Sequence, residues 1–189
     1  MLFIFDFDST LAELQGVPWA EVKKKVIAYG ESQGFDIDPS VHLVNTANHI
    51  SDNNERKAEV DRIFREYEKK AVEAGTFKVY ESTIPTLETL RNLGHKTAIA
   101  SNNTEPTIRE VVEASGIPVD SIRGRTSVFR PKPFPDMLQS IMEEFGVPKE
   151  ETFMTGDNFW DEGAGKAAGV KTFIIKPGTL DISLFTSIV

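Results

Sequence analysis

Residues 2–11 read LFIFDFDSTL, and the rest of the chain can be interpreted outward from this stretch. Leu2 to Phe5 form a short apolar run, typical of a strand buried on both faces of a parallel sheet. The run ends at Asp6 and Asp8, whose side chains point the same way if the extended geometry continues. Like charges this close oppose each other's ionisation, so a metal ion or a shared proton is expected there. The alternative is a polar strand exit with two solvated acids.

The composition limits the classes of function. The 189 residues allow one large domain or a core with a smaller one. A net charge of −8 without a long basic run argues against nucleic acid as a partner. The chain has no cysteine, which excludes disulfides and thiolate metal sites. The opening apolar run is too short for a secretory signal or a membrane span, so we expect a cytoplasmic protein without a membrane partner.

From Trp19 to about residue 77 the pattern predicts helices only. Apolar residues recur at helical spacing in three stretches that begin near Trp19, Pro39 and Asn53. From about residue 78, helices alternate with short buried strands, predicted at 97–100, 152–155 and 171–175, with a weaker one within 122–128. This alternation indicates βαβ units and a parallel sheet. The helical block interrupts that pattern after its first strand, so it is interpreted as an inserted lid over the strand ends.

Polar residues follow the predicted strands, at the edge where open α/β sheets bind ligands. They are Asp6 and Asp8 after the first strand, Ser101 and Asn102 after the second, Asp157 and Asp161 after the fourth, and Lys132 between prolines in a loop. Each has an ordinary explanation alone: a helix cap, a turn acid or a solvated lysine. Together they suit phosphoryl transfer, because carboxylates bind Mg²⁺ or act as nucleophiles, and a lysine and a hydroxyl hold phosphoryl oxygens.

Four stretches resemble the motifs of the haloacid dehalogenase superfamily, in its phosphatase-like branch that includes phosphoglycolate phosphatases and β-phosphoglucomutases. They are residues 3–11, 100–103, 132–133 and 156–161, in the family's order and after the corresponding strands. The resemblance implies an α/β fold: a Rossmann-like three-layer core with a central parallel sheet, formed by residues 1–16 and 78–189. It also implies that residues 17–77 are a small α-helical cap domain inserted between the first and second motifs.

The resemblance also implies a role for each matching residue. Asp6 would be the nucleophile and Asp8 the general acid/base, and Ser101, Asn102 and Lys132 would bind phosphate. Mg²⁺ would be held by Asp6, Asp157 and the backbone carbonyl of Asp8, and Asp161 would support the metal water or Lys132 from behind. Ser9 departs from the more frequent glycine, and no loss of activity is inferred from it.

Several residues receive no role in this interpretation. Phe159 and Trp160 are unusually bulky within the fourth motif and are expected to pack under the loop. His42 is expected at the surface. Arg123 and Arg125 are expected to share one strand face and to be solvated, with attraction of anionic substrates as the alternative.

The predicted function is therefore a Mg²⁺-dependent phosphohydrolase acting on a small phosphorylated metabolite through an aspartyl-phosphate. One alternative is a phosphomutase of sugar phosphates with the same first step; another is a protein phosphatase, which a capped site disfavours. A non-catalytic binding module on the same fold is opposed by the intact Asp6, Asp8, Lys132 and Asp157, and a dehalogenase is opposed by Asp8. The sequence carries no motif for the substrate or for an oligomeric state.

Overall fold

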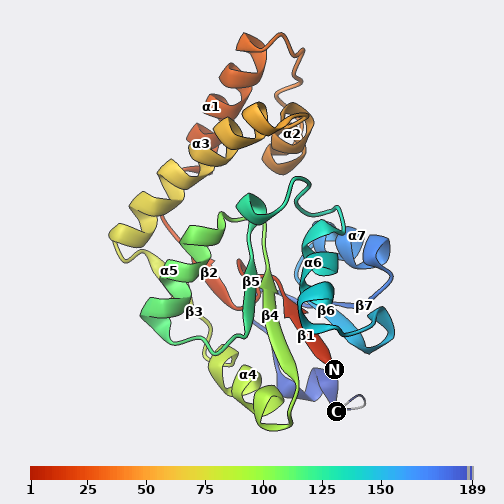
Figure 1. The fold of residues 1–189 in the computed structure, drawn as a ribbon. Coiled ribbons are helices and arrows are strands. Elements are labelled where there is room, and N and C mark those ends of the chain that lie inside the picture. Colours follow the sequence, from red (N-terminus) through yellow and green to blue (C-terminus); the bar gives the residue numbers. More distant parts are fainter. Residues whose placement is uncertain (187, 189) are drawn as a thin grey trace.

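A computed structural model describes residues 1–186 and 188 of the protein. Its centre is a five-stranded sheet in the order β5-β4-β1-β6-β7, with every neighbouring pair parallel (Figure 1). The strands are β1 (Leu2–Phe5), β4 (Lys96–Ala100), β5 (Ser121–Arg123), β6 (Thr152–Gly156) and β7 (Lys171–Ile174). The predicted α/β class with a central parallel sheet is confirmed.

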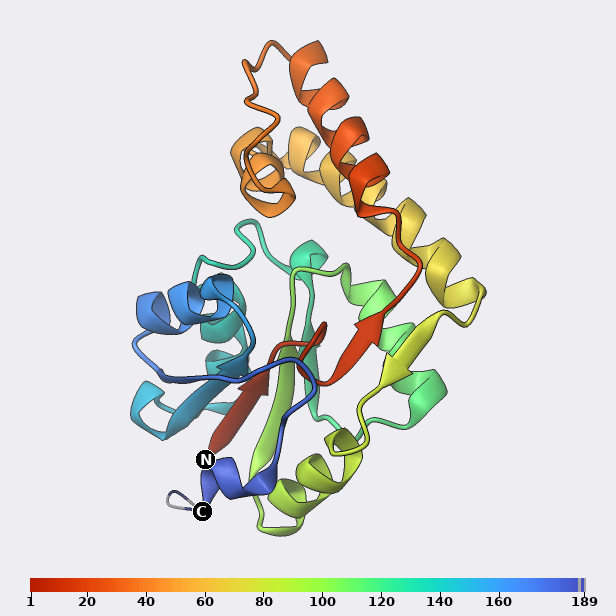
Figure 2. The same cartoon turned by 180° about the vertical axis from the view of Figure 1, so that it is seen from behind.

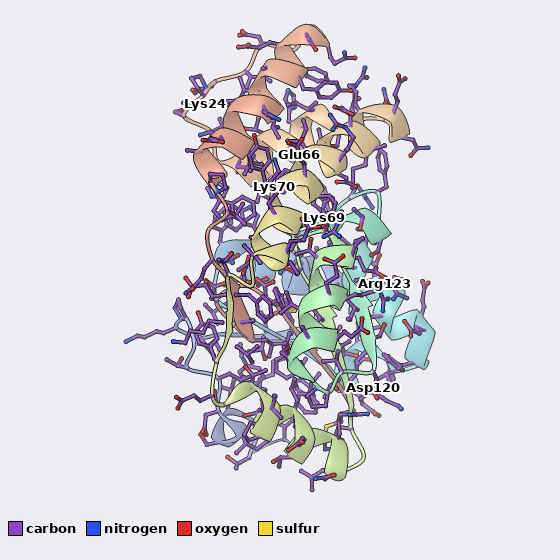
Figure 3. All side chains as sticks on the ribbon, turned by 90° about the vertical axis from the view of Figure 1, so that its left-hand side faces the viewer. Lys24, Glu66, Lys69, Lys70, Asp120 and Arg123 are labelled. Carbon is purple, nitrogen blue, oxygen red and sulfur yellow. The ribbon has the colours of Figure 1, made fainter. Side chains whose placement is uncertain are left out.

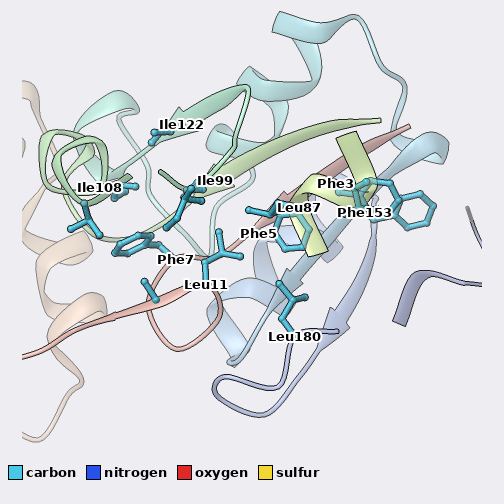
Figure 4. Close-up of a cluster of buried hydrophobic side chains, with 14 of the residues drawn as sticks. Phe3, Phe5, Phe7, Leu11, Leu87, Ile99, Ile108, Ile122, Phe153 and Leu180 are labelled. Atoms are coloured by element: carbon cyan, nitrogen blue, oxygen red, sulfur yellow. The ribbon is translucent and has the colours of Figure 1, made fainter. Parts of the chain in front are cut away.

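Alternate side chains of β1 enter the two apolar layers on opposite faces of the sheet, as the two-residue repeat of a strand requires. Phe3 and Phe5 join the cluster that contains residues of α4 and α5, part of which is drawn in Figure 4. Leu2 and Ile4 join the cluster that contains residues of α6 and α7. These helices are α4 (Thr83–Asn92), α5 (Glu105–Ser115), α6 (Asp136–Phe145) and α7 (Phe159–Ala168). The continuous hydrophobicity of β1 follows from this burial on both faces.

Three short 3₁₀ helices complete the α/β part. They are η1 (Arg125–Ser127), η2 (Lys149–Glu151) and η3 (Ile182–Phe185). The last of them places the Phe185 ring edge-on to Phe3, with centroids 5.0 Å apart. The C-terminal segment therefore closes one end of the core cluster around β1.

The helices α1 (Trp19–Ser32), α2 (Leu43–Ile50) and α3 (Asn54–Glu73) surround an apolar cluster of their own. The third helix begins where the sequence predicts, because the Asn53 side chain caps it by accepting a hydrogen bond from the Arg56 N–H at 2.9 Å. The predicted start of the second helix at Pro39 is wrong. It begins at Leu43, after His42, whose ring nitrogen accepts from the Val44 N–H.

The two chain crossings between the helices and the large sheet run side by side as a small antiparallel ribbon (Figure 2). Its strands are β2 (Ala12–Leu14) and β3 (Phe77–Val79), with Ala12 opposite Val79 and Leu14 opposite Phe77. The sequence pattern did not predict this ribbon. In the described part of the chain, none of the helices combines the length and the hydrophobicity that crossing a membrane requires.

Candidate active site

The carboxyl ends of β1, β4 and β6 open on one cavity of about 310 Å³. Six of the seven predicted site residues line it: Asp6, Asp8, Ser101, Asn102, Lys132 and Asp157. The seventh, Asp161, is fully buried and contacts Lys132. The parallel sheet thus brings together side chains that lie up to about 150 positions apart in the sequence, as expected for the carboxyl edge of such a sheet.

Asp6 is held by its neighbours on one side of its carboxylate. The residue is 5% exposed. Its Oδ1 accepts a hydrogen bond from the Phe7 N–H at 2.6 Å and lies 2.9 Å from the Lys132 Nζ. Its own backbone N–H donates to the Thr155 carbonyl on β6, which continues the pairing beyond β1. Oδ2 has no protein donor among the described residues. One oxygen is therefore fixed while the other remains available to a ligand.

Lys132 lies between two buried carboxylates. Its Nζ is 2.9 Å from Asp6 and 2.5 Å from Asp161, and the side chain is almost completely buried. Burial alone would lower the pKa of Lys132, but the two carboxylates outweigh it and raise the pKa, so the ammonium is retained. This ammonium fixes the orientation of Asp6 and places a positive charge at the cavity.

Asp161 is locked in place behind Lys132. Its Oδ2 accepts hydrogen bonds from the N–H groups of Asp157 and Asn158. The bond from Asn158 is one half of the capping box at the start of α7, and the Asn158 side chain accepts the other. A side chain at Gly156 would collide with the Asp161 carboxylate, so the chain needs a glycine there. The predicted contact of Asp161 with Lys132 is present. Both Asp161 oxygens are occupied by donors.

Asp8 has a different environment from Asp6. Its two oxygens accept from the Leu14 N–H at 2.7 Å and from Asn103 Nδ2 at 3.0 Å. Burial raises the pKa of the Asp8 carboxyl to about 7, although both hydrogen bonds oppose the shift. Next to it, Ser9 has a φ of 64°, the positive-φ region that favours glycine. A carboxyl with a pKa near neutrality can both donate and accept a proton.

Ser101 and Asn102 follow the end of β4 and line the cavity on the same side as the acids. The Ser101 hydroxyl donates to Asn103 Oδ1 at 3.1 Å. Asn102 Nδ2 donates to the Lys132 carbonyl at 3.1 Å, while its Oδ1 is buried without a partner in the described structure. Through this hydrogen bond to the backbone, Asn102 positions the loop that carries Lys132.

A group of carboxylates suits a hard cation. Oxygens of Asp6, Asp157 and Asp161 lie within 4.8 Å of one another. Because both Asp161 oxygens accept hydrogen bonds, Asp6 and Asp157 are the members with an oxygen to spare. Burial and the charge of Asp6 raise the pKa of Asp157, so a cation between them would relieve an unfavourable arrangement. This all-oxygen donor set fits Mg²⁺. The Asp8 carboxylate does not belong to the group.

Residues of the helices α1–α3 and the N-cap of α2 line the other side of the cavity: Trp19, Leu43, Val44, Phe64 and the capping His42. Trp160, which received no role from the sequence, also lines it and joins the two sides. Its ring lies 4.4 Å from the His42 ring, and its Nε1–H donates to Asn45 Oδ1 at 3.2 Å. Asn48 on α2 donates to the Lys132 carbonyl at 3.3 Å. The exposed His42 was expected at the surface, but it also contributes to the site.

A cluster of charged residues that the sequence analysis missed joins α3 to the α/β part. Lys57, Asp61 and Glu68 lie on one face of α3 and are buried, whereas Glu66, Lys69 and Lys70 form ion pairs on its exposed side (Figure 3).

Arg125 is the partner of this buried face. It is 0% exposed, its Nε lies 2.8 Å from Asp61, and its guanidinium lies 3.9 Å from the Phe64 ring centroid. The expectation of a solvated Arg125 on a strand is wrong, because it lies in η1 under α3. Arg123 is partly buried and pairs with Glu144 at 2.7 Å. Glu68 accepts a hydrogen bond from the Thr104 N–H at 3.0 Å.

Comparisons with known proteins identify the family of the chain. The family model for haloacid dehalogenase-like hydrolases matches residues 3–175. The pyrophosphatase PpaX of Halalkalibacterium halodurans is 37% identical over 98 residues, and the phosphoglycolate phosphatase of Rhodospirillum rubrum is 28% identical over 102 residues. These matches cover 51% and 53% of the chain but 46% and 42% of those proteins, so the chain spans less than half the length of these curated relatives.

Solved structures share the fold. A haloacid dehalogenase-like hydrolase from Bacteroides fragilis has a TM-score of 0.69 at 23% identity, covering 98% of this chain and 92% of its own. CbbY from Rhodobacter sphaeroides in complex with xylulose-(1,5)bisphosphate has a TM-score of 0.62 at 19% identity, covering 93% and 85%. The match to the family model confirms the resemblance inferred from the four motifs. Because the family model spans most of the sequence, the chain belongs to the haloacid dehalogenase-like hydrolase family.

Proposed function

We propose that the protein is a Mg²⁺-dependent phosphohydrolase that releases phosphate from a small phosphorylated molecule through a phosphorylated aspartate. The observation that carries this proposal is the arrangement around Asp6. One of its oxygens is fixed by Lys132 and the Phe7 N–H, and the residue lines a cavity shared with Asp8 and Asp157. A fixed carboxylate beside a positive charge is suited to attack an electrophile whose oxygens are anionic.

In the first step an oxygen of Asp6 forms a bond to the substrate phosphorus while the bond from phosphorus to the alcohol oxygen breaks. Asp8 gives its proton to that departing oxygen, so the alcohol leaves neutral. A carboxyl with a pKa near 7 is well suited to this role, because it retains a proton at neutral pH more readily than an ordinary aspartate. Lys132 and Ser101, which line the same cavity, would bind the phosphoryl oxygens.

In the second step Asp8, now deprotonated, accepts a proton from a water molecule. The water oxygen bonds to phosphorus, the bond from phosphorus to the Asp6 oxygen breaks, and phosphate and the free carboxylate are released. Asn103 donates its Nδ2–H to Asp8, which makes it a positioning residue. The two steps together consume one water and restore both carboxyl groups.

Asp6 and Asp157 would hold Mg²⁺, with the Asp8 carbonyl assigned by family resemblance. When bound, the ion neutralises charge on the phosphoryl oxygens and orients them. Asp161 would act by holding Lys132 and the Asp157 backbone, not as a ligand. We further propose that residues 1–16 and 78–189 are the catalytic core and that 17–77 are a cap that limits substrate size.

Turnover of 4-nitrophenyl phosphate by the purified chain tests the proposal. We expect release of nitrophenol with Mg²⁺, none in excess chelator, and recovery when Mg²⁺ is added back. Asp6→Asn should be inactive, whereas Asp38→Asn, at an exposed acid outside the cavity, should match the parent. Full turnover in excess chelator, or by Asp6→Asn, would refute the assignment. A non-catalytic binding module predicts no turnover in any condition.

A further inference from the structure

The cavity has two chemically different sides. The side formed by the strand ends carries the acids, Lys132 and Ser101, whereas the opposite side is apolar. Its apolar contacts come from Trp19, Leu43, Val44, Phe64 and Trp160. Once a phosphoryl group is bound at the strand ends, the group attached to it must lie toward these side chains. The nature of that group is therefore constrained by what an apolar surface can accept.

The apolar side offers no charge to a second anion. Among the described residues that line the cavity, Lys132 is the only lysine or arginine, and it already faces Asp6 and Asp161. Burial and the nearby Lys23 lower the pKa of His42, which leaves its ring neutral at pH 7. Arg125 is buried against Phe64 and Asp61 and does not line the cavity. A carboxylate or a second phosphate bound at this side would lose its hydrating water without gaining a counter-charge, which is unfavourable.

The aromatic contact is held in place before a ligand arrives. The Trp160 ring packs on His42, and its Nε1–H is satisfied by Asn45, so the indole does not have to find a partner when the cavity is filled. Trp19 packs 6.2 Å from the Phe64 ring on the same side. A preorganised surface of this kind loses little conformational entropy on binding.

We propose that this site selects phosphate monoesters of an uncharged, apolar, ring-sized alcohol over those whose alcohol carries an anion, and that Trp160 and Val44 determine this specificity. The proposal deepens the phosphohydrolase function proposed above and rests on it. A cavity of about 310 Å³ is at the small end of ligand sites, which matches a phosphoryl group with one ring. Two relatives are named after phosphoglycolate and pyrophosphate. Each of these molecules carries a second anionic group, for which the described residues lining this cavity offer no counter-charge.

Binding of three phosphonates tests the preference without the bias of leaving-group chemistry, because their P–C bond is not hydrolysed. Isothermal titration calorimetry with Mg²⁺ would give Kd for benzylphosphonate, methylphosphonate and phosphonoacetate. We expect benzylphosphonate to bind at least about tenfold more tightly than phosphonoacetate, with methylphosphonate in between. Equal binding, or tighter binding of phosphonoacetate, overturns the proposal. If phosphonoacetate bound more tightly and Lys23→Met abolished this binding, Lys23 and not the apolar surface would determine the selectivity.

Variants assign the preference to residues. Trp160→Ala should weaken benzylphosphonate about 3- to 10-fold and leave methylphosphonate within about twofold, since only the ring contact is lost. Phe129→Ala is the matched control, because Phe129 is also an exposed phenylalanine, at 43% exposure, and does not line the cavity. Asn45→Ala removes the hydrogen bond to Trp160 but keeps the ring. If it weakened benzylphosphonate binding as much as Trp160→Ala does, the effect would come from the position of α2, which would contradict a role for the ring contact.

A gain of function provides the converse test. Val44 lines the cavity but lies outside the apolar cluster of the helices, so Val44→Arg adds a cation with little loss of core packing. We expect phosphonoacetate to bind about tenfold more tightly and benzylphosphonate more weakly; no gain for phosphonoacetate in the folded variant counts against the proposal. Failure of the two proposals is distinguishable: turnover with a reversed phosphonate preference refutes the specificity alone, whereas the expected preference without turnover refutes the hydrolysis.

Discussion

Replacing Lys132 by methionine removes the ammonium that lies between Asp6 and Asp161 and tests the ionic arrangement of the site. The three residues are 1%, 5% and 0% exposed, so the substitution leaves two buried carboxylates without their counter-charge. Breaking a buried pair in this way costs about 3–5 kcal/mol of unfolding free energy. Lys25→Met is the matched control, because Lys25 pairs with Glu66 at a site where the side chains are 49% and 33% exposed. It should leave the free energy of unfolding close to that of the parent, because an exposed ion pair contributes little to stability.

Urea denaturation of the parent and the variants in chelator, followed by circular dichroism, measures these costs. The double variant Lys132→Met/Asp161→Asn should regain more than about 1 kcal/mol of the unfolding free energy lost in Lys132→Met, because it removes one of the two buried carboxylates that have no counter-charge. Activity should be absent from both variants, so the double variant separates stability from function. A loss of less than about 1 kcal/mol in Lys132→Met, or a double variant less stable than the single one, would contradict a buried ionic arrangement around Lys132.

Three further predictions follow from single residues. Burial raises the pKa of Glu68 above its usual 4.5, so its contribution to stability is complete below pH 4.5 and is lost as the pH rises through the folded-state pKa. The stability of Glu68→Gln relative to the parent should therefore increase from pH 5 to pH 8 in urea titrations, and a constant difference would contradict this. Ser9→Gly should raise the unfolding free energy by about 0.5–1 kcal/mol, since glycine accepts the φ of 64° without strain, and a loss of stability would argue against it. Asp157→Asn should raise the Mg²⁺ concentration for half-maximal turnover more than about tenfold, and an unchanged requirement would remove Asp157 from the metal site.

The large sheet and the residues at its carboxyl edge were predictable because their signals are local. The run from Leu2 to Phe5 is hydrophobic on both faces, and β1 is covered on both faces. In a parallel sheet the strand ends must meet at one edge, so the order of the motifs was enough to bring Asp6, Ser101 and Asp157 together. The cap of α3 at Asn53 is likewise a local signal.

The features that sequence reasoning missed depend on contacts between distant segments. The ribbon of β2 and β3 consists of three-residue strands, which are too short to show an alternating pattern, and they pair across more than sixty positions. Arg125 lies beneath α3, where burial is set by tertiary packing and not by its neighbours in sequence. The spacing of Lys57, Asp61 and Glu68 could have revealed a shared helix face, but not its partner. The contact of Trp160 with His42 depends on where α2 lies.

We propose Asp6 as the nucleophile and Asp8 as the acid/base. Loss of a positioned acid/base should slow turnover by about 10²–10⁴ in Asp8→Asn. With a labelled aryl phosphate, whose leaving group needs little protonation, the first step should suffer less than the second, so label should accumulate on the protein. Rapid quench of Asp8→Asn and mapping of the acid-stable adduct test this directly. We expect the label on Asp6; label on any other residue, or turnover by Asp6→Asn, would contradict these roles.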